Sequence, residues 1–397
     1  MKAEPGQGKV RSGGAGARRR QEFFYRLARR LLLPYFSRRF NTTADPQPGL
    51  PAPYVVVSNH VTELDFFLTG QVFSEPMGFV VGEGLLRNPL LRFILVKGFG
   101  CIAKQKGAAD ARTAMGMLRR LREGRNVCLY AEGNTTFDGR TGEIPPATGA
   151  LLRAVKAGLV VTRIEGAYFS MPRWGRGIRR GMTRCRVAGV YTAEELAGMT
   201  DGEVNSLLAR LLSLDAYFEQ EREQVPYRGK NPAGGIHHVL YLCPQCLSQG
   251  TLAGEGERVR CAECGMETVY TPTGFFEGRK PFPGIRDWAD WQRERLRDLL
   301  AAPGGQPAVE DRGQTLMEMR GGAFVPVAEG TMALAGGALA IGGYAFPLET
   351  LPGLEIYRKN VLQFSTPDGR RFQTRPNGAF NALKYRDAYR IIREQKG

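Results

Sequence analysis

Residues 54–67 of this chain read YVVVSNHVTELDFF, and this stretch decides the fold class. The apolar run Tyr54–Ser58 predicts a buried strand, and a polar segment separates it from the apolar start of a helix. Further apolar runs predict strands at Gly78–Val81, Val127–Ala131 and Leu159–Ile164, with helical stretches between them, notably Ala109–Glu123 and Thr148–Ala157. Strands that alternate with helices predict an α/β fold around a largely buried sheet.

His60 and Asp65 flank the polar segment that follows the first predicted strand. Thr62-Glu63-Leu64-Asp65 has the form of a helix N-terminal cap, so we expect a helix to begin at Thr62. His60 then lies in the incoming loop and can fold back over the first turn, where Asp65 accepts a hydrogen bond from one imidazole nitrogen. The other nitrogen is left as a base. The alternative is that Asp65 is only a capping residue and His60 only a loop residue.

A second polar segment follows the strand predicted at Val127–Ala131. It supplies an acid, a glycine and hydroxyl or amide side chains: Glu132, Gly133, Asn134, Thr135 and Thr136. Ligands of α/β sheets bind at the carboxyl ends of the strands, so we expect this segment to lie near His60. Lys104 and Lys106, which end the intervening glycine-flanked run, either meet an anionic headgroup or are solvated loop lysines.

Residues from about 45 to 190 resemble the glycerolipid acyltransferase domain typified by 1-acylglycerol-3-phosphate acyltransferases. The first motif of that family, Asn-His-x-x-x-x-Asp, is present as Asn59, His60 and Asp65. The third motif, Phe-Pro-Glu-Gly-Thr-Arg-Ser, is partly present at residues 130–136, and the second, Gly-x-x-x-x-x-Arg, corresponds to residues 100–106. The resemblance covers about a third of the chain.

The resemblance implies an acyltransferase-type αβα domain. Its activity would be transfer of a fatty acyl group from acyl-CoA or acyl carrier protein to a lysophospholipid hydroxyl (a 1-acylglycerol-3-phosphate-like acceptor) in phospholipid biosynthesis. His60 would act as general base toward that hydroxyl, and Asp65 would fix the imidazole tautomer and support the developing positive charge. This step requires no metal and no covalent enzyme intermediate. The expected substrate contacts are Asn59, Lys104, Lys106, Glu132, Gly133, Asn134, Thr135, Thr136 and Arg140.

Three positions depart from the family pattern. Thr135 stands where the third motif has an acceptor-binding arginine, Lys106 replaces the arginine of the second motif, and Arg163 stands at the proline of a fourth. The catalytic pair is retained while the groups that hold phosphate are altered. Arg140 or Arg163 could compensate, and the alternative for each is a surface arginine. The pattern therefore favours acyl transfer more than it favours lysophosphatidic acid as the acceptor.

Two Cys-x-x-Cys pairs, separated by residues 247–260, occur after a linker rich in glycine and proline at residues 226–236. Four thiolates in two paired turns predict a tetrahedral Zn²⁺ site in a zinc ribbon. Because the ligand set is closed, we expect a structural zinc, and we regard His237 and His238 as bystanders. The expected ligands are Cys243, Cys246, Cys261 and Cys264.

The chain has 397 residues with 55 Lys+Arg and 39 Asp+Glu, and its formal charge of +16 favours anionic partners. More than half of this excess lies in the first forty residues. There, Gln21–Leu33 predicts a helix, ended by Pro34, with aromatic and aliphatic residues on one face and cations on the other. This pattern is typical of a helix that lies on an anionic membrane surface. The alternative is a basic helix docked on its own domain.

No run of about 18–20 apolar residues predicts a membrane span, and no secretory signal is recognised. We therefore expect a cytoplasmic protein that associates peripherally with the inner face of the membrane.

We expect a basic tail and membrane-binding helix at 1–42, an acyltransferase domain at 43–228, a zinc ribbon at 236–276 and a helical linker at 277–307. A small β-rich domain with a C-terminal helix, similar to a pleckstrin-homology-like barrel, follows at 308–397. Two other functions are alternatives. A nucleic-acid-binding zinc-ribbon protein fits the charge, but no aromatic–basic RNA-binding signature is present, so no nucleic acid partner is expected. An inactive acyltransferase-like scaffold would not need intact His60 and Asp65.

Overall fold

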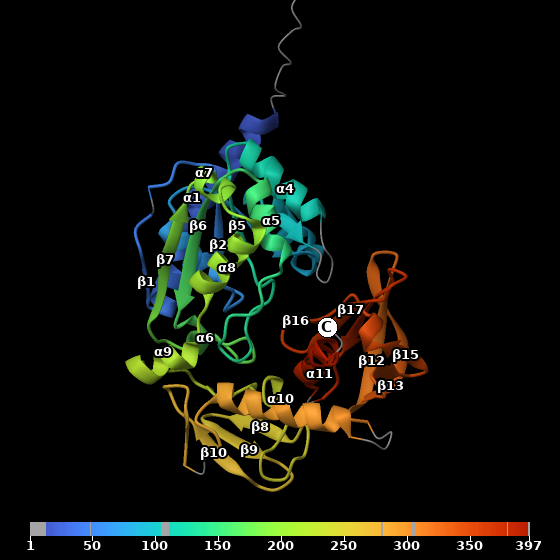
Figure 1. Cartoon of the computed structure of the whole chain (residues 1–397). Helices are drawn as coiled ribbons and strands as arrows, with labels where there is room; N and C mark the ends of the chain where they lie inside the picture. Colours follow the sequence, from blue (N-terminus) through green and yellow to red (C-terminus); the bar gives the residue numbers. More distant parts are fainter. Residues whose placement is uncertain are drawn as a thin grey trace, which may run out of the picture.

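The computed structural model describes residues 13–47, 49–104, 111–278, 281–302, 307–378 and 380–395. These residues form three parts that follow one another along the chain (Figure 1). The first part (blue to green) and the third (orange to red) each contain a seven-stranded sheet, and the second (yellow) contains a four-stranded sheet. The helices α10 (Ile285–Ala301) and α11 (Ala382–Glu394) contact each other where the second and third parts meet.

The sheet of the first part is mostly parallel. Its strands are β1 (Thr42–Ala44), β2 (Tyr54–Ser58), β3 (Met77–Gly82), β4 (Ile102–Lys104), β5 (Asn126–Tyr130), β6 (Gly158–Glu165) and β7 (Thr183–Tyr191). Their order is β1-β7-β6-β2-β5-β3-β4, and only the β6–β7 pair is antiparallel. Every residue of β2 and β5 is buried, as in sheets covered on both faces. The predicted α/β fold is confirmed.

Helices divide the core of the first part between the two faces of the sheet. They include α1 (Gly13–Phe40), α2 (Asp65–Val72), α4 (Ala111–Arg122), α5 (Ala147–Ala154) and α8 (Asp201–Leu212). Successive strand residues point to opposite faces. Val56 of β2 therefore packs in the cluster on the side of α1 and α2, whereas Val55 and Val57 pack in the cluster on the side of α4, α5 and α8.

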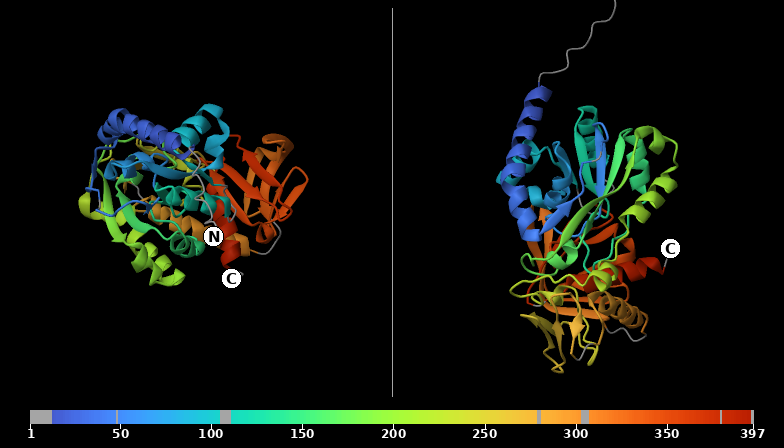
Figure 2. Two further views of the ribbon diagram at one scale, coloured as in Figure 1. Left: turned by 90° about the horizontal axis from the view of Figure 1, so that it is seen from above. Right: turned by 90° about the vertical axis from the view of Figure 1, so that its left-hand side faces the viewer.

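The first helix is longer than its sequence predicts. α1 contains Pro34 and continues to Phe40, so the predicted end at Pro34 is wrong. A proline inside a helix removes one backbone hydrogen bond, and packing outweighs that loss here. The ring of Phe36 stacks on that of Phe67 with centroids 3.9 Å apart, and Phe40 is fully buried. In the right-hand view of Figure 2, α1 (blue) runs along the outside of the first part.

Two stretches of the first part are broken into short helices. The segment between β3 and β4 forms η1 (Glu83–Arg87), α3 (Pro89–Arg92) and η2 (Phe93–Gly98). The polar stretch from Thr192 to about residue 223 forms three helices, α7 (Ala193–Ala197), α8 and α9 (Ala216–Glu223). Thr192 and Thr200 each form a capping box that starts one of them, and Asp215 caps the third. A short helix, α6 (Ala167–Ser170), follows β6. Within the described residues, no helix combines the length and apolar character needed to cross a bilayer.

The second part is a small antiparallel sheet covered by α10. Its strands are β8 (Leu252–Glu255), β9 (Arg258–Cys261), β10 (Glu267–Tyr270) and β11 (Phe276–Glu277), and the turn η3 (Ile236–His238) precedes them. Their order is β11-β10-β9-β8. Trp288 of α10 is fully buried and donates from Nε1 to the carbonyl oxygen of Leu242 at 3.0 Å, which fixes the helix on this part.

The third part is entirely antiparallel and ends in α11. Its strands are β12 (Val309–Arg320), β13 (Ala323–Ala335), β14 (Ala338–Ile341), β15 (Tyr344–Pro347), β16 (Gly353–Tyr357), β17 (Val361–Ser365) and β18 (Arg371–Arg375), with the turn η4 (Leu348–Thr350) before β16. The order β15-β14-β13-β12-β18-β17-β16 makes β16 an edge strand. Burial alternates along β16, β17 and β18, as expected where one face packs on a core. The predicted β-rich part with a C-terminal helix is confirmed, and its likeness to a pleckstrin-homology barrel stays a prediction.

Candidate active site

His60 and Asp65 lie at the carboxyl end of β2, where the chain turns into α2. His60 Nδ1 is 2.8 Å from Asp65 Oδ2. The Asp65 side chain is 1% exposed and that of His60 is 23% exposed, so the imidazole reaches solvent and the carboxylate does not. Because an ionised carboxylate only accepts hydrogen bonds, we assign the hydrogen to Nδ1, which leaves the lone pair on Nε2.

The turn before α2 wraps around the carboxylate of Asp65. Its Oδ2 accepts a hydrogen bond from the backbone N of Val61 at 2.6 Å, and its Oδ1 accepts from the backbone N and Oγ1 of Thr62, both at 2.9 Å. α2 begins at Asp65, so the predicted start at Thr62 is wrong. The carboxylate holds residues 61 and 62 in a turn instead, and these contacts fix its orientation toward His60.

Tyr130, the last residue of β5, packs against the imidazole. Its ring stacks on that of His60 with centroids 4.6 Å apart and planes 19° apart. Its hydroxyl lies 3.2 Å from Thr69 Oγ1, which anchors the ring beneath the site. No role was predicted for Tyr130 from the sequence. Its position as the first residue of the third motif is the feature that could have pointed to a contact with His60.

Glu132 links the two motif loops. Its Oε1 accepts a hydrogen bond from the backbone N of His60 at 2.7 Å, and its Oε2 accepts from the backbone N of Gly142 at 2.5 Å. Burial raises the pKa of Glu132 to about 8, although both backbone donors lower it. The side chain thus fixes the backbone that carries the imidazole.

The third motif continues along the same edge of the sheet. Gly133 has a φ of 70°, and a Cβ there would lie 3.5 Å from Lys104 Nζ, so the ammonium group of Lys104 lies beside this glycine. The backbone N of Thr136 donates to the carbonyl oxygen of His60 at 3.2 Å. The structure therefore brings the loops after β2 and β5 together, as the sequence predicts, and it adds the end of β4 to them.

Two other predicted substrate contacts bind within the protein. The side-chain amide of Asn59 donates to the carbonyl oxygen of Ile164 at 3.0 Å and accepts from its N at 2.7 Å, so it joins the loop to β6. Arg140 forms ion pairs with Asp138 at 2.8 Å and with Asp290 of α10 at 2.6 Å. The guanidinium of Arg140 thus fastens the first part to α10.

Arg140 and Arg163, the two predicted substitutes for the phosphate-binding arginines, both pair with carboxylates of the protein. Arg163, the second predicted substitute, donates two hydrogen bonds to Glu165 Oε1, at 2.9 and 2.8 Å. Lys106 lies outside the described residues. Lys104 is therefore one cation that the described structure brings to the third motif.

Arg173 connects the third motif to the third part of the chain. Its guanidinium donates to three backbone carbonyl oxygens, those of Thr135 at 2.9 Å, Ile356 at 2.6 Å and Arg358 at 2.8 Å. In the sequence, Arg173 opens a cationic segment without an acid, residues 173–186, which predicts contact with anionic lipid, with an acidic acyl carrier protein or with solvent. The guanidinium is instead buried between β16 and the motif loop.

The edge strand β16 also contributes a side chain to the third motif. Glu355 Oε2 accepts a hydrogen bond from Asn134 Nδ2 at 2.6 Å. Close by, Lys359 donates to the carbonyl oxygen of Gly175. Asn134 and Glu355 are 221 positions apart, so no local pattern could have predicted that they meet.

The four predicted metal ligands come together in the second part. All four sulfur atoms lie within 4.8 Å of one another. The Sγ atoms of Cys243 and Cys264, and those of Cys246 and Cys261, are 3.7 Å apart. Sulfurs at the corners of a tetrahedron, each about 2.3 Å from a zinc ion, are about 3.8 Å apart. The four cysteines can therefore bind a metal ion.

Comparisons with known proteins identify the first part. Residues 42–164 match the acyltransferase family model. No match was found among curated protein sequences. Among solved structures, the chain is similar to the 1-acyl-sn-glycerophosphate (LPA) acyltransferase PlsC from Thermotoga maritima, with 15% identity and a TM-score of 0.43 over 54% of this chain and 85% of that one. The family match includes the loops that carry His60 and Glu132, and this chain accordingly contains an acyltransferase-family domain.

Proposed function

We propose that this protein transfers a fatty acyl group from a thioester donor to the hydroxyl of a lysophospholipid. The observation that carries the proposal is the contact of 2.8 Å between His60 Nδ1 and Asp65 Oδ2 inside a region that matches acyltransferases. A partly exposed imidazole with one nitrogen bonded to a buried carboxylate is the arrangement that general base catalysis requires. The donor is acyl-CoA or an acylated carrier protein.

In the proposed reaction, His60 Nε2 removes the proton from the acceptor hydroxyl as its oxygen attacks the thioester carbonyl carbon. The imidazolium is stabilised by Asp65, whose position is fixed by Val61 and Thr62. Collapse of the tetrahedral intermediate breaks the carbon–sulfur bond, and the imidazolium returns its proton to the leaving thiolate. The products are the acylated lipid and the free thiol, and His60 is regenerated in its neutral form.

The remaining predicted contacts differ in the support they have. Lys104, Gly133, Asn134, Thr135 and Thr136 stay in the proposal as residues around the acceptor, and Lys106 stays in it on sequence grounds alone. Asn59, Glu132 and Arg140 have protein partners that fit a positioning role better than direct contact with lipid.

We also propose that α1 binds an anionic membrane surface at the inner face. Phe23, Leu27 and Leu31 recur every four residues, so they share one side of the helix, and all three are exposed. The opposite side of α1 is used internally, since Tyr25 donates from its hydroxyl to the carbonyl oxygen of Phe73 at 3.0 Å. Exposed apolar side chains on a basic helix are typical of helices that lie in a bilayer surface.

A second exposed apolar segment lies beside α1. Leu90 of α3 and Phe93 of η2 are both exposed. Arg20 of α1 donates from Nε to the carbonyl oxygen of Lys97 at 2.7 Å, which holds η2 next to the helix. The apolar residues of this segment fit a protein core equally well, so its place beside the proposed membrane-binding helix could not be predicted from the sequence.

Vesicle binding tests the membrane proposal. Changing Phe23, Leu27 and Leu31 to Asp should weaken binding to vesicles rich in phosphatidylglycerol by about 100-fold or more, since each buried apolar side chain contributes roughly 1.5–3 kcal/mol. Met115→Asp, at an exposed apolar residue of α4, is the matched control and should bind like the parent protein. Equal binding of the triple variant and the control would contradict a membrane role for α1.

We propose that the cysteine site holds a structural Zn²⁺. The separations of 3.7 Å between sulfurs fit tetrahedral thiolate coordination. When bound, the ion cross-links the two Cys-x-x-Cys turns and supplies no catalytic step. In this proposal the acyltransferase domain spans residues 43–228, the zinc ribbon 236–276 and the C-terminal β-rich domain 308–397. The ribbon therefore lies between the other two domains along the chain.

Product analysis tests the acyl transfer itself. Purified full-length protein is incubated with acyl-CoA or acylated carrier protein and a panel of lysophospholipids, and new diacyl lipids are identified by mass spectrometry. A diacyl product that requires His60 is the expected result. If no acceptor is acylated by a folded protein with either donor, the inactive scaffold becomes the better interpretation.

A further inference from the structure

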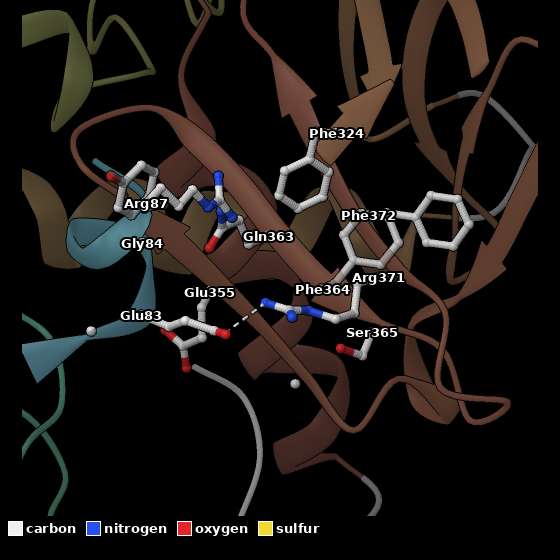
Figure 3. Close-up of a pocket in the computed structure, with 13 residues that line it drawn as sticks. Glu83, Gly84, Arg87, Phe324, Glu355, Gln363, Phe364, Ser365, Arg371 and Phe372 are labelled. Atoms are coloured by element: carbon white, nitrogen blue, oxygen red, sulfur yellow. Dashed lines mark hydrogen bonds and ion pairs between the residues drawn. The ribbon is translucent and has the colours of Figure 1, made fainter. Parts of the chain in front are cut away.

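A cavity lies between the acyltransferase domain and the C-terminal sheet (Figure 3). It lies between η1 and strands β16–β18, and the space there, open solvent included, is about 570 Å³. Glu83 and Arg87 line it from η1, and Glu355 and Arg371 line it from the sheet. No predicted site residue lines it, and it is not explained by the proposed reaction.

The walls of this cavity are held together by direct contacts between the two parts. Arg371 forms an ion pair with Glu83 at 3.4 Å, shown by the dashed line in Figure 3. Gly84 lies so close to the ring of Tyr357 that a Cβ at this position would be 2.8 Å from it. The cavity is thus built by both parts.

The cavity is adjacent to the candidate active site. Glu355, which lines it, accepts the hydrogen bond of 2.6 Å from Asn134 in the third motif. On the other side, Gly82, which also lines it, pairs in register with Lys104 across β3 and β4. Lys104 Nζ lies beside Gly133, so the cavity borders the place where the acceptor would be held.

Two charges in the cavity are not neutralised by an ion pair. Arg371 and Glu83 pair with each other. Among the residues that the structure describes, no carboxylate forms an ion pair with Arg87, whose guanidinium stacks on Phe324 at 4.7 Å, and no cation forms one with Glu355. The cavity therefore offers one cation and one carboxylate, from different walls, to a ligand.

Two buried cations that interact electrostatically with Glu355 are committed elsewhere. Arg173 interacts electrostatically with it, but its guanidinium donates to three backbone carbonyl oxygens. Arg386 also interacts with it from a distance and lies over the ring of Phe137. A carboxylate beside the third motif disfavours a phosphate monoester with two negative charges, since like charges repel at this range.

We infer that this cavity binds the headgroup of a zwitterionic acceptor, a lysophospholipid whose phosphate diester carries an amine. In this inference, which rests on the proposed acyl transfer, Arg87 binds the phosphate and Glu355 binds the ammonium group. Charge-assisted hydrogen bonds to both groups select such a headgroup over a phosphate monoester. The altered arginines of the second and third motifs are consistent with this choice, because a monoester would depend on them.

Exposed apolar residues lie next to the cavity, as expected for a site that binds a lipid headgroup. Leu85 lies in the same short turn as Glu83 and Arg87 and is exposed. Leu90, just beyond it, is also exposed. A headgroup in the cavity therefore leaves its acyl chain next to the surface that we propose to bind the membrane.

The kinetic test compares two acceptors with full-length protein. Glu355→Gln should raise KM for lysophosphatidylethanolamine about tenfold or more while leaving kcat nearly unchanged, because it removes one charged contact. KM for lysophosphatidic acid should stay the same or fall. The amide retains an oxygen that accepts from Asn134, so the variant is expected to fold. Glu329→Gln, on the exposed surface of β13, is the matched control and should leave both KM values unchanged.

A binding test does not depend on turnover. With His60→Ala protein, calorimetry should detect sn-glycero-3-phosphoethanolamine binding that is about tenfold tighter than glycerol 3-phosphate binding, and adding Glu355→Gln should abolish the preference. The inference is overturned if glycerol 3-phosphate binds as tightly, or if Glu355→Gln alters both acceptors equally. Transfer to lysophosphatidic acid with no effect of Glu355→Gln would overturn only this inference, whereas transfer to neither acceptor would overturn the proposed function.

Discussion

The two seven-stranded sheets of this chain contribute to the candidate site in different ways. The first is mostly parallel, and His60, Glu132 and Lys104 meet because each follows or ends one of its parallel strands. The second is antiparallel and reaches the same place through its edge strand, β16, which presents Glu355 and backbone carbonyls. In the parallel sheet, the ends of neighbouring strands meet at one edge and bring their functional groups together. The antiparallel sheet contributes groups only from the edge strand that packs against the first part.

The ribbon with α10 connects these two sheets. Asn381, which caps α11, donates from Nδ2 to the carbonyl oxygen of His237 at 2.6 Å. On the other side of the ribbon, Asp290 of α10 pairs with Arg140 of the acyltransferase domain. Because the second part contacts both of the others, we expect the cavity between the two sheets to require a folded ribbon.

Loss of the metal is the largest change that we predict for this arrangement. Structural zinc sites contribute on the order of 10 kcal/mol to folding of the segment that binds them. Replacing Cys243 and Cys261 with Ser should remove about one zinc ion per chain, unfold the ribbon and free the C-terminal sheet from the acyltransferase domain. Metal analysis measures the loss of zinc. Hydrogen exchange along β16 measures the release of the C-terminal sheet.

Cys185→Ala is the control for the metal variant. Cys185 is buried in the acyltransferase core and does not belong to the metal cluster, so this protein should keep its zinc. A double Ser variant whose β16 amides exchange as slowly as those of the parent protein would show that the two sheets hold together without the ribbon.

Removal of the proposed base should abolish activity while both sheets stay folded. His60→Ala is expected to lower kcat by about a thousandfold, the usual contribution of a general base. Its urea unfolding curve should remain close to that of the parent, because the imidazole is partly exposed. His237→Ala, outside the site, should keep full turnover, and a His60→Ala protein with normal kcat would exclude His60 as the base.

The part of the site that the sequence predicts is the part built from local contacts. His60 and Asp65 are five positions apart in one turn, so the motif already specifies their meeting. The four cysteines are predictable for a related reason, because their chemistry and spacing leave few other uses. In both cases the information lies in side-chain type and short separation.

The part that the sequence does not predict depends on packing over long separations. Pro34 should end α1 by its local cost, but contacts of Phe36 and Phe40 in the folded chain extend the helix. Arg173 looks like one of several surface arginines until the C-terminal sheet covers it. The contacts of Phe36, Phe40 and Arg173 cannot be read from the hydrophobic periodicity or the composition of the sequence.

The direct link between the sheets can be broken at Arg173. Arg173→Met removes the Arg173 donor from three carbonyl oxygens, two of them in buried contacts, and each buried oxygen costs roughly 1–3 kcal/mol when water cannot replace the donor. We expect the free energy of unfolding in urea to fall by about 2–4 kcal/mol. Arg176→Met, at an exposed arginine of the same segment, should change it by less than about 0.5 kcal/mol. Equal stability of the two variants would mean that the sheets dock through other contacts.

The last effect that we predict is a dependence of stability on pH at Glu132, which is small over any single pH unit. Its pKa is about 8 in the folded protein, raised by burial from a usual value of 4.5. The folded state therefore binds the proton more tightly than the unfolded state, so this contribution to stability is fully present below about pH 4.5 and is lost as pH rises through 8. The free energy of unfolding should decrease by at most about 1.4 kcal/mol per pH unit in that window.

Glu132→Gln separates this titration from the others in the protein. The amide has no proton to lose, and its oxygen can still accept from the backbone N of His60, so the loop after β2 should keep its place. Unfolding measured between pH 5 and pH 9 should decline less steeply for the variant than for the parent. Parallel curves would mean that the two backbone donors keep Glu132 ionised throughout. The carboxylate would then hold the loop of the first sheet by charge, much as Asp65 does, and the burial of Glu132 would carry no pH dependence of its own.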